Sequence, residues 1–175
     1  MRSTLLAATL LFSATAAFGQ APPKATILAD WERTKSNLLA YVDAAPDSML
    51  GFRPTPGVRT FAQQFEHVVQ SDIDVAALAI KGLQQAPVLG DSTRYLHNKA
   101  ALRAYVAASY DYTIAAIRDA TPAQLNRVSS MYRQPEAPAW RWLQLAHEHS
   151  IWTFGQVIAY LRLNRVTPPP YSMPF

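Results

Sequence analysis

Residues 140–170 read WRWLQLAHEHSIWTFGQVIAYLRLNRVTPPP, and this stretch decides the fold because it is the longest uninterrupted helical pattern in the chain. Steps of three and four place one line of its residues on a single helix face, which we expect to be buried: Leu145, His149, Trp152, Thr153, Gln156, Tyr160 and Leu163. The three prolines at 168–170 cannot continue a helix and end it. A histidine in the middle of a buried face indicates either a metal site or a hydrogen-bonded core.

Apolar residues recur at helical spacing in three earlier segments, residues 26–44, 60–81 and 98–119. The second of these segments begins with T-F-A-Q, the spacing of a capping box, and Gly82 lies at its end. No alternation of period two, which would predict a strand, persists beyond a few residues. The predicted fold class is therefore all-α, an up-down four-helix bundle over residues 26–170.

The connections between these helices carry the residues typical of turns and loops. Proline and glycine mark predicted loops at residues 47–59, 84–97 and 131–138. Thr121-Pro122 predicts a short helical turn, with the threonine as its cap. We expect Phe52 to pack on one end of the bundle and Gly155 to allow a close approach between helices.

The N-terminus has the pattern of a secretory signal peptide. Arg2 precedes an apolar run, residues 5–18, which ends in small residues. We predict a cleaved signal over residues 1–19 with Ala21 as the alternative cleavage point, a leader over residues 20–25, and a tail over residues 171–175. The protein is then exported to the periplasm or the extracellular space, and an uncleaved membrane anchor is the alternative. No later segment is apolar enough to predict a stable membrane span.

The composition excludes several classes of protein. Of the 175 residues 50% are hydrophobic and 16% charged, enough apolar residues to build a core. The formal net charge is +4, and no stripe of Lys and Arg interleaved with aromatics accompanies it, so we expect no nucleic-acid partner. The chain has no cysteine, which excludes disulfides and thiolate ligands. Any transition metal must then be held by His, Asp, Glu or water.

The order and spacing of several motifs resemble the DinB/YfiT-like four-helix-bundle superfamily across residues 31–170. The end of the family's last helix is matched by five residues followed by Pro-Pro: His149, Gly155, Gln156, Tyr160 and Arg162. A second landmark is F-R-P-T-P at residues 52–56, followed by His67 in the next helix. A third is K-A-A-L at residues 99–102.

The resemblance implies a metal site and a reaction class. In this family one histidine of the second long helix and two of the last helix bind a divalent metal, commonly zinc or nickel. Carried over by position, His67 and His149 are two of these ligands, and the third position holds Thr153. Characterised members are thiol S-transferases or thiol-dependent isomerases.

The residues leave two interpretations of the histidine pair open. In the first, His67 and His149 hold a zinc or nickel ion for an enzyme of the thiol S-transferase-like type. In the second, they are hydrogen-bonded core histidines in a non-catalytic bundle with a degenerate site, which binds a small molecule or a partner, or forms a homodimer. Four polar residues are predicted to line the cavity between the helices: Gln64, Ser71, Thr153 and Gln156. We expect His147, about 200° around the helix from His149, to be partly exposed, and His97, in a loop, to lie at the surface.

Overall fold

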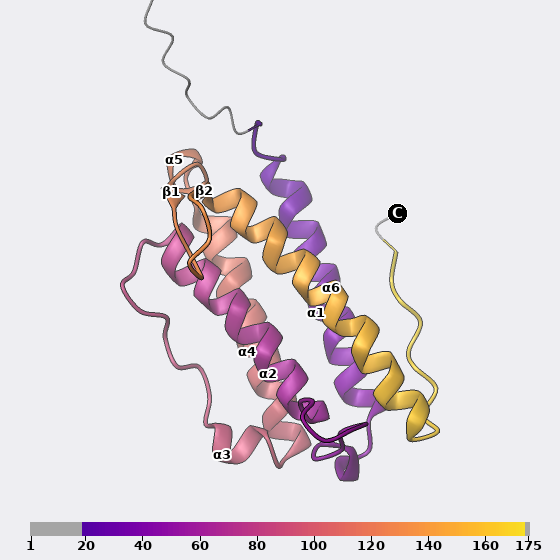
Figure 1. Ribbon diagram of the computed structural model, residues 1–175. Coiled ribbons are helices and arrows are strands. Elements are labelled where there is room, and N and C mark those ends of the chain that lie inside the picture. The colour runs from indigo at the N-terminus through magenta and orange to yellow at the C-terminus, as the bar shows by residue number, and fades with distance from the viewer. Residues whose placement is uncertain (1–18, 174–175) are drawn as a thin grey trace, which may run out of the picture.

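The computed structural model describes residues 19–173, which form a bundle of four long helices (Figure 1). These are α1 (Lys24–Ala44), α2 (Phe61–Asp74), α4 (Lys99–Asp119) and α6 (Ala139–Leu163). All four predicted helices are confirmed. The predicted signal peptide, residues 1–19, lies outside the described residues except for Gly19.

Shorter elements connect the long helices. They are a 3₁₀ turn η1 (Asp47–Met49), a π-helical segment η2 (Val75–Ile80), the short helices α3 (Ser92–Tyr95) and α5 (Pro122–Leu125), and the strands β1 (Val128–Ser129) and β2 (Ala137–Pro138). The antiparallel pairing of β1 with β2 corrects the expectation of a strand-free chain, because it lies partly in the predicted loop at residues 131–138. A two-residue ladder has no periodicity that a sequence pattern could reveal.

The predicted capping box at the start of α2 is confirmed. The Thr60 hydroxyl accepts from the Gln63 backbone N–H at 3.3 Å, and the Gln63 side chain accepts from the Thr60 N–H at 2.9 Å. The helix continues through η2 and ends before Gly82, which has φ +70°. A side chain there would also collide with the guanidinium of Arg127, which donates to the carbonyl of Ile80.

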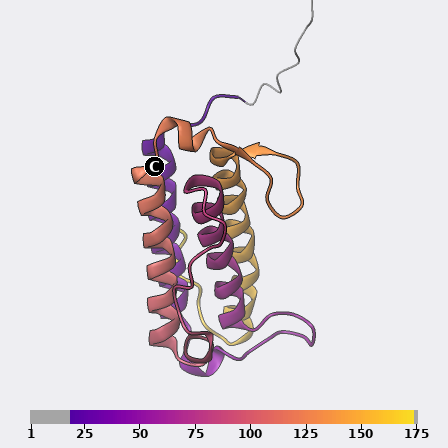
Figure 2. The ribbon, with the colours of Figure 1, turned by 90° about the vertical axis from the view of Figure 1, so that its left-hand side faces the viewer.

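The helices do not alternate in direction as an up-down bundle requires. Lys99, at the start of α4, donates to the carbonyl of Ala45 beyond the end of α1, so α1 and α4 are antiparallel. Tyr105 of α4 donates to Gln70 of α2, and both helices then run toward the same end of the bundle (Figures 1 and 2). The predicted up-down connectivity is therefore wrong. Its physical reason is the long connection at residues 81–98, which runs back along the bundle before α4 begins.

Apolar side chains from all four long helices fill the interior. The largest fully buried ones include Trp31, Leu38, Phe61, Phe65, Leu102, Ile114 and Leu143. The ring of Trp31 packs on Tyr110, with centroids 5.7 Å apart. Phe52 closes one end of the bundle by an edge contact with Tyr160, as expected.

The buried face of α6 differs from the predicted one. Trp152 is 75% exposed and Leu163 63% exposed, whereas Trp142, Ala146 and Val157 are buried. Of the predicted stripe, only Thr153 and Tyr160 are buried. Large apolar residues occur on both sides of this helix, so their spacing alone cannot choose which side faces the core. Gly155 is exposed and touches no other element, so the predicted close approach within the bundle is also wrong.

Two further features bear on the sequence predictions: the length and hydropathy of the helices, and the position of the C-terminal tail. No helix among residues 19–173 is both long and apolar enough to span a bilayer. The predicted tail begins packed on α1, because the Ser172 N–H donates to Asn37 and the Tyr171 hydroxyl accepts from Arg33.

A carboxyl group lies fully buried in the bundle interior. Asp72 of α2 is 0% exposed, and neither of its oxygens accepts a hydrogen bond of good geometry. The Tyr110 hydroxyl donates to Ser150, and the Ser150 hydroxyl donates to the carbonyl of Ala146. Burial raises the pKa of Asp72 well above its usual range, and the hydroxyls of Tyr110 and Ser150 offset this shift only in part. The folded protein therefore holds the Asp72 proton to a higher pH than the unfolded chain does.

Asp72→Asn is expected to stabilise the protein at neutral pH and to do so less in acid. As pH rises above about 4, the unfolded chain loses the Asp72 proton while the folded chain holds it, so wild-type stability falls. Asparagine has the same shape and does not titrate. We expect its Tm advantage to grow from pH 4 to pH 7.5 by more than about 3 °C, the shift that about 1 kcal/mol produces in a domain of this size. Parallel melting curves check this, and a pH-independent difference would contradict it.

Candidate functional site

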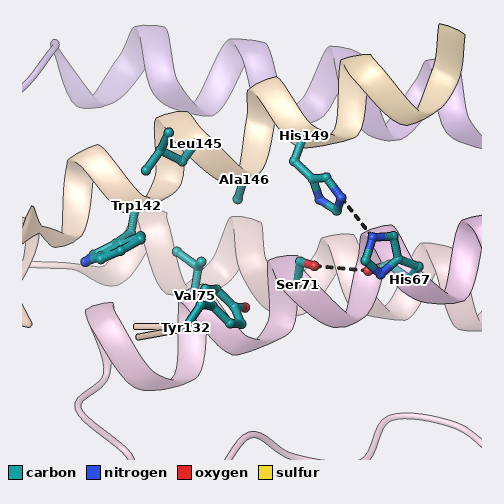
Figure 3. Close-up of a pocket in the computed structure, with 8 residues that line it drawn as sticks. All are labelled: His67, Ser71, Val75, Tyr132, Trp142, Leu145, Ala146 and His149. Carbon is teal, nitrogen blue, oxygen red and sulfur yellow. Dashed lines mark hydrogen bonds between the residues drawn. The ribbon is translucent and has the colours of Figure 1, made fainter. Parts of the chain in front are cut away.

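The antiparallel packing of α2 on α6 brings His67 and His149 together. Their Nε2 atoms lie 3.0 Å apart and their rings meet edge to face, with centroids 4.7 Å apart (Figure 3). Both side chains are half-buried. The pairing of these two histidines, which lie 82 positions apart in the sequence, is the central feature of the site.

Both rings of the pair are neutral. A hydrogen bond between two imidazole nitrogens needs one N–H donor and one bare acceptor. Burial lowers the pKa of His149, and the positive charge of Arg59 lowers it further. The pKa of His67 is lowered by burial, then by Arg59 and by His149. The pair therefore shares one proton and offers one donor and one acceptor at neutral pH.

A cavity of about 300 Å³ opens beside the histidine pair. Its lining residues come from α2, η2, the turn between β1 and β2, and α6: His67, Ser71, Val75, Tyr132, Trp142, Leu145, Ala146 and His149 (Figure 3). The aromatic and aliphatic groups gather toward one end, and the two imidazoles and Ser71 toward the other. The Ser71 hydroxyl donates to the carbonyl of His67 at 3.0 Å, so its proton is already used.

The apolar end of the cavity is held in place by the segment that joins β1 to β2. The indole N–H of Trp142 donates to the carbonyls of Ser129 and Ala137, at 3.0 and 3.1 Å. Tyr132 and Arg133 at the tip of the turn have φ +53° and +60°, a region that non-glycine residues rarely occupy. The Tyr132 hydroxyl lies 3.3 Å from the carboxylate of Asp74, to which it donates. The turn thus fixes a tyrosine at the edge of the cavity.

Of the four predicted lining residues, only Ser71 lines this cavity. Gln64 and Thr153 border a separate void of about 10 Å³ inside the bundle, large enough for a single water at most. Gln156 is exposed and accepts from the Gln64 amide at 3.2 Å. The same amide donates to the Tyr160 hydroxyl at 3.0 Å. Gln64 therefore links α2 to α6 through these two hydrogen bonds.

The other two histidines lie away from the cavity. His147 is half-buried against Trp31 of α1, with ring centroids 6.2 Å apart. Its Nε2 lies 2.9 Å from the Thr34 hydroxyl, whose own proton goes to the carbonyl of Asp30. His147 must then be the donor. His97 is exposed, as expected.

The residues around the pair do not complete the family's three-ligand metal site. Two ligand nitrogens on a tetrahedral zinc lie about 3.3 Å apart, so His67 and His149 at 3.0 Å could serve as neighbouring ligands. Thr153, at the third position, is buried and borders the other void. Within residues 19–173 no group of three or more His, Cys, Asp or Glu side chains is placed to hold a metal ion.

Five lining residues were not predicted: Val75, Tyr132, Trp142, Leu145 and Ala146. Trp142 and Ala146 lie on the side of α6 that faces α2, as His149 does. A correct prediction of the buried side of α6 would therefore have identified them as lining residues. The sequence does not predict that Tyr132 lines the cavity, because its turn carries neither the glycine nor the asparagine that positive φ angles usually require.

Comparisons with known proteins agree on the fold. Residues 30–157 match the family model of the DinB superfamily. The structure is similar to the crystal structure of a DinB-like protein from Bacillus subtilis, with a TM-score of 0.68 and 18% sequence identity over 84% of this chain and 98% of that chain. At this identity the likeness concerns the fold alone. No curated protein matches the sequence.

Proposed function

The chain belongs to the DinB superfamily, and from this premise we propose that it is a non-catalytic, exported member that binds a small, mostly apolar molecule between α2 and α6. The observation that carries the proposal is the cavity of about 300 Å³, which has apolar walls and two neutral imidazoles at one end. Ligand sites in proteins are typically concave and mostly apolar, with a few placed polar groups that orient the ligand.

The charges around the cavity support a neutral ligand with one polar group. The histidine pair offers one donor and one acceptor, so it can bind a hydroxyl, amine or carbonyl without any net charge. Arg59 acts on both rings with a positive charge, which disfavours a cation. Val75, Trp142 and Leu145 would remove the apolar body of the ligand from water.

The proposed export rests on the signal-peptide pattern of residues 1–19. An exported protein lies outside the reducing compartments, where the small thiols used by characterised relatives are abundant. The place of the third metal ligand is taken by Thr153. Both features support binding rather than thiol transfer.

One observation favours a second candidate function, a divalent-metal-dependent enzyme of the thiol S-transferase-like type. The two facing Nε2 atoms belong to neutral rings, the form in which imidazole binds zinc or nickel. Such a site would need further ligands from water or substrate, since the described residues supply only two.

Binding of N-phenyl-1-naphthylamine tests the proposal and separates it from the alternative. This neutral probe has two ring systems and one N–H group, and it fluoresces on entering an apolar site. We expect saturable binding with one site per chain, unchanged by EDTA or by added zinc. Absence of binding would contradict the proposal. Stoichiometric zinc or nickel binding by calorimetry that is lost in His67→Ala would favour the enzyme instead.

A further inference from the structure

The outer face of α6 carries apolar side chains that nothing in the bundle covers. Trp152 is 75% exposed and Ile151 40% exposed, and Gly155 and Ala159 beside them are exposed as well. The exposure of these residues places this face on the outside of the bundle, away from the core. None of these residues lines the ligand cavity, although the lining residues Leu145 and His149 lie two turns and one turn before Trp152 on a neighbouring side of α6.

The residues on this face are arranged symmetrically about Gly155. Glu148 lies seven positions before the glycine and Arg162 seven positions after it, about 10.5 Å along the helix in each direction. Trp152 and Ile158 lie three positions away on either side, Ile158 half-buried against the core at the edge of the face, and Ile151 and Ala159 lie four positions away. The face thus has an apolar centre, and its two ends carry opposite charges.

A two-fold axis through Gly155 would make this face complementary to itself. Antiparallel pairing of two α6 helices about that axis places Trp152 opposite Ile158 of the second copy, and Glu148 opposite Arg162 of the second copy at both ends. Isologous contacts of this kind are the commonest in homo-oligomers. Gly155 has no Cβ, and beyond the adjoining backbone of α6 no atom lies within 4 Å of where one would be, so the two backbones can approach closely.

We propose that α6 is a homodimer interface, in which two copies of the chain pair antiparallel with Gly155 at the crossing point and Glu148 facing Arg162. Glu148 is 64% exposed, and its contact within the chain is a 3.6 Å ion pair with Arg141. Exposed ion pairs of this kind contribute little to stability, so the Glu148 carboxylate remains available to pair with Arg162 of the second copy. A single helix pair buries less surface than a standard interface, and a weak dimer, about micromolar, is expected.

Charge reversal followed by sedimentation analysis tests the pairing. Wild type should show a reversible monomer–dimer equilibrium. Glu148→Arg alone and Arg162→Glu alone should each weaken dimerisation at least tenfold, since each brings like charges together twice. A mixture of the two variants should dimerise again, because both contacts in the mixed dimer join opposite charges. Glu32→Arg, which breaks a similarly exposed ion pair between α1 and α4, is the matched control and should dimerise like wild type.

Three outcomes would overturn the proposal. The first is a wild-type chain that stays monomeric at several hundred micromolar. The second is a dimer that persists in both single variants and in Trp152→Ala, which would place the contact on another face. The third is a mixture that dimerises no better than its components, which would exclude the antiparallel register. Melting curves of each variant, with unchanged Tm, show that loss of the dimer does not come from unfolding.

Discussion

Ala146→Leu is expected to weaken binding of N-phenyl-1-naphthylamine about 10- to 100-fold while leaving the fold intact. Ala146 lies at the middle of the cavity wall, between Trp142 and His149 on α6 (Figure 3). The larger side chain would occupy space that the probe needs, and each tenfold loss corresponds to about 1.4 kcal/mol. Because the added atoms enter an existing cavity, they should not strain the core as overpacking does.

The measurement is a fluorescence titration of the purified variant with the probe. Ser71→Leu is a second filling variant, placed on α2 at the polar end of the same cavity, and should weaken binding as well. Ala29→Leu, at an exposed position of α1, is the matched control. Wild-type affinity in both filling variants would show that the probe binds elsewhere.

Trp31→Ala is expected to lower the free energy of unfolding by about 3–5 kcal/mol, a large part of the stability of a domain of this size. Trp31 of α1 is 1% exposed. Its ring packs on Tyr110 of α4 and on His147 of α6, so it joins three of the four long helices. Removing it leaves a cavity where these helices meet.

Urea unfolding, followed by circular dichroism, measures this loss. Trp152→Ala is the matched control, because the same change is made at a side chain that is 75% exposed. At protein concentrations below the expected dimerisation range, it should change the free energy of unfolding by less than about 0.5 kcal/mol. Equal effects of the two substitutions would mean that the described packing of α1 is incorrect.

The fold was largely predictable from local patterns. Capping at Thr60, the left-handed glycine at position 82 and the prolines after α6 mark helix ends through chemistry that acts within a few residues. The direction of α4 was not predictable in this way. It depends on how the connection at residues 81–98 runs along the bundle, and a loop sequence does not specify that path.

The site was predictable only in part. His67 and His149 could be paired by resemblance, and the structure brings them to 3.0 Å. Gln64 and Thr153 lie about one helical turn from these histidines, but their side chains project from a different side of each helix. They border the separate void in the interior of the bundle. Tyr132 reaches the cavity through a turn with two positive φ angles, for which its sequence gives no signal. Assigning the cavity walls requires knowing which side of α6 faces the core. The apolar residues on both sides of this helix leave that choice ambiguous.

A histidine ring ¹H–¹⁵N correlation spectrum, recorded while N-phenyl-1-naphthylamine is added at pH 7, tests the central claim most directly. The four histidines of the chain report on the cavity and on its surroundings in one experiment. We predict that the ring signals of His67 and His149 shift together and saturate, whereas those of His97 and His147 stay in place. Shifts confined to His97 or His147, with the pair unchanged at saturating probe, would contradict ligand binding between α2 and α6.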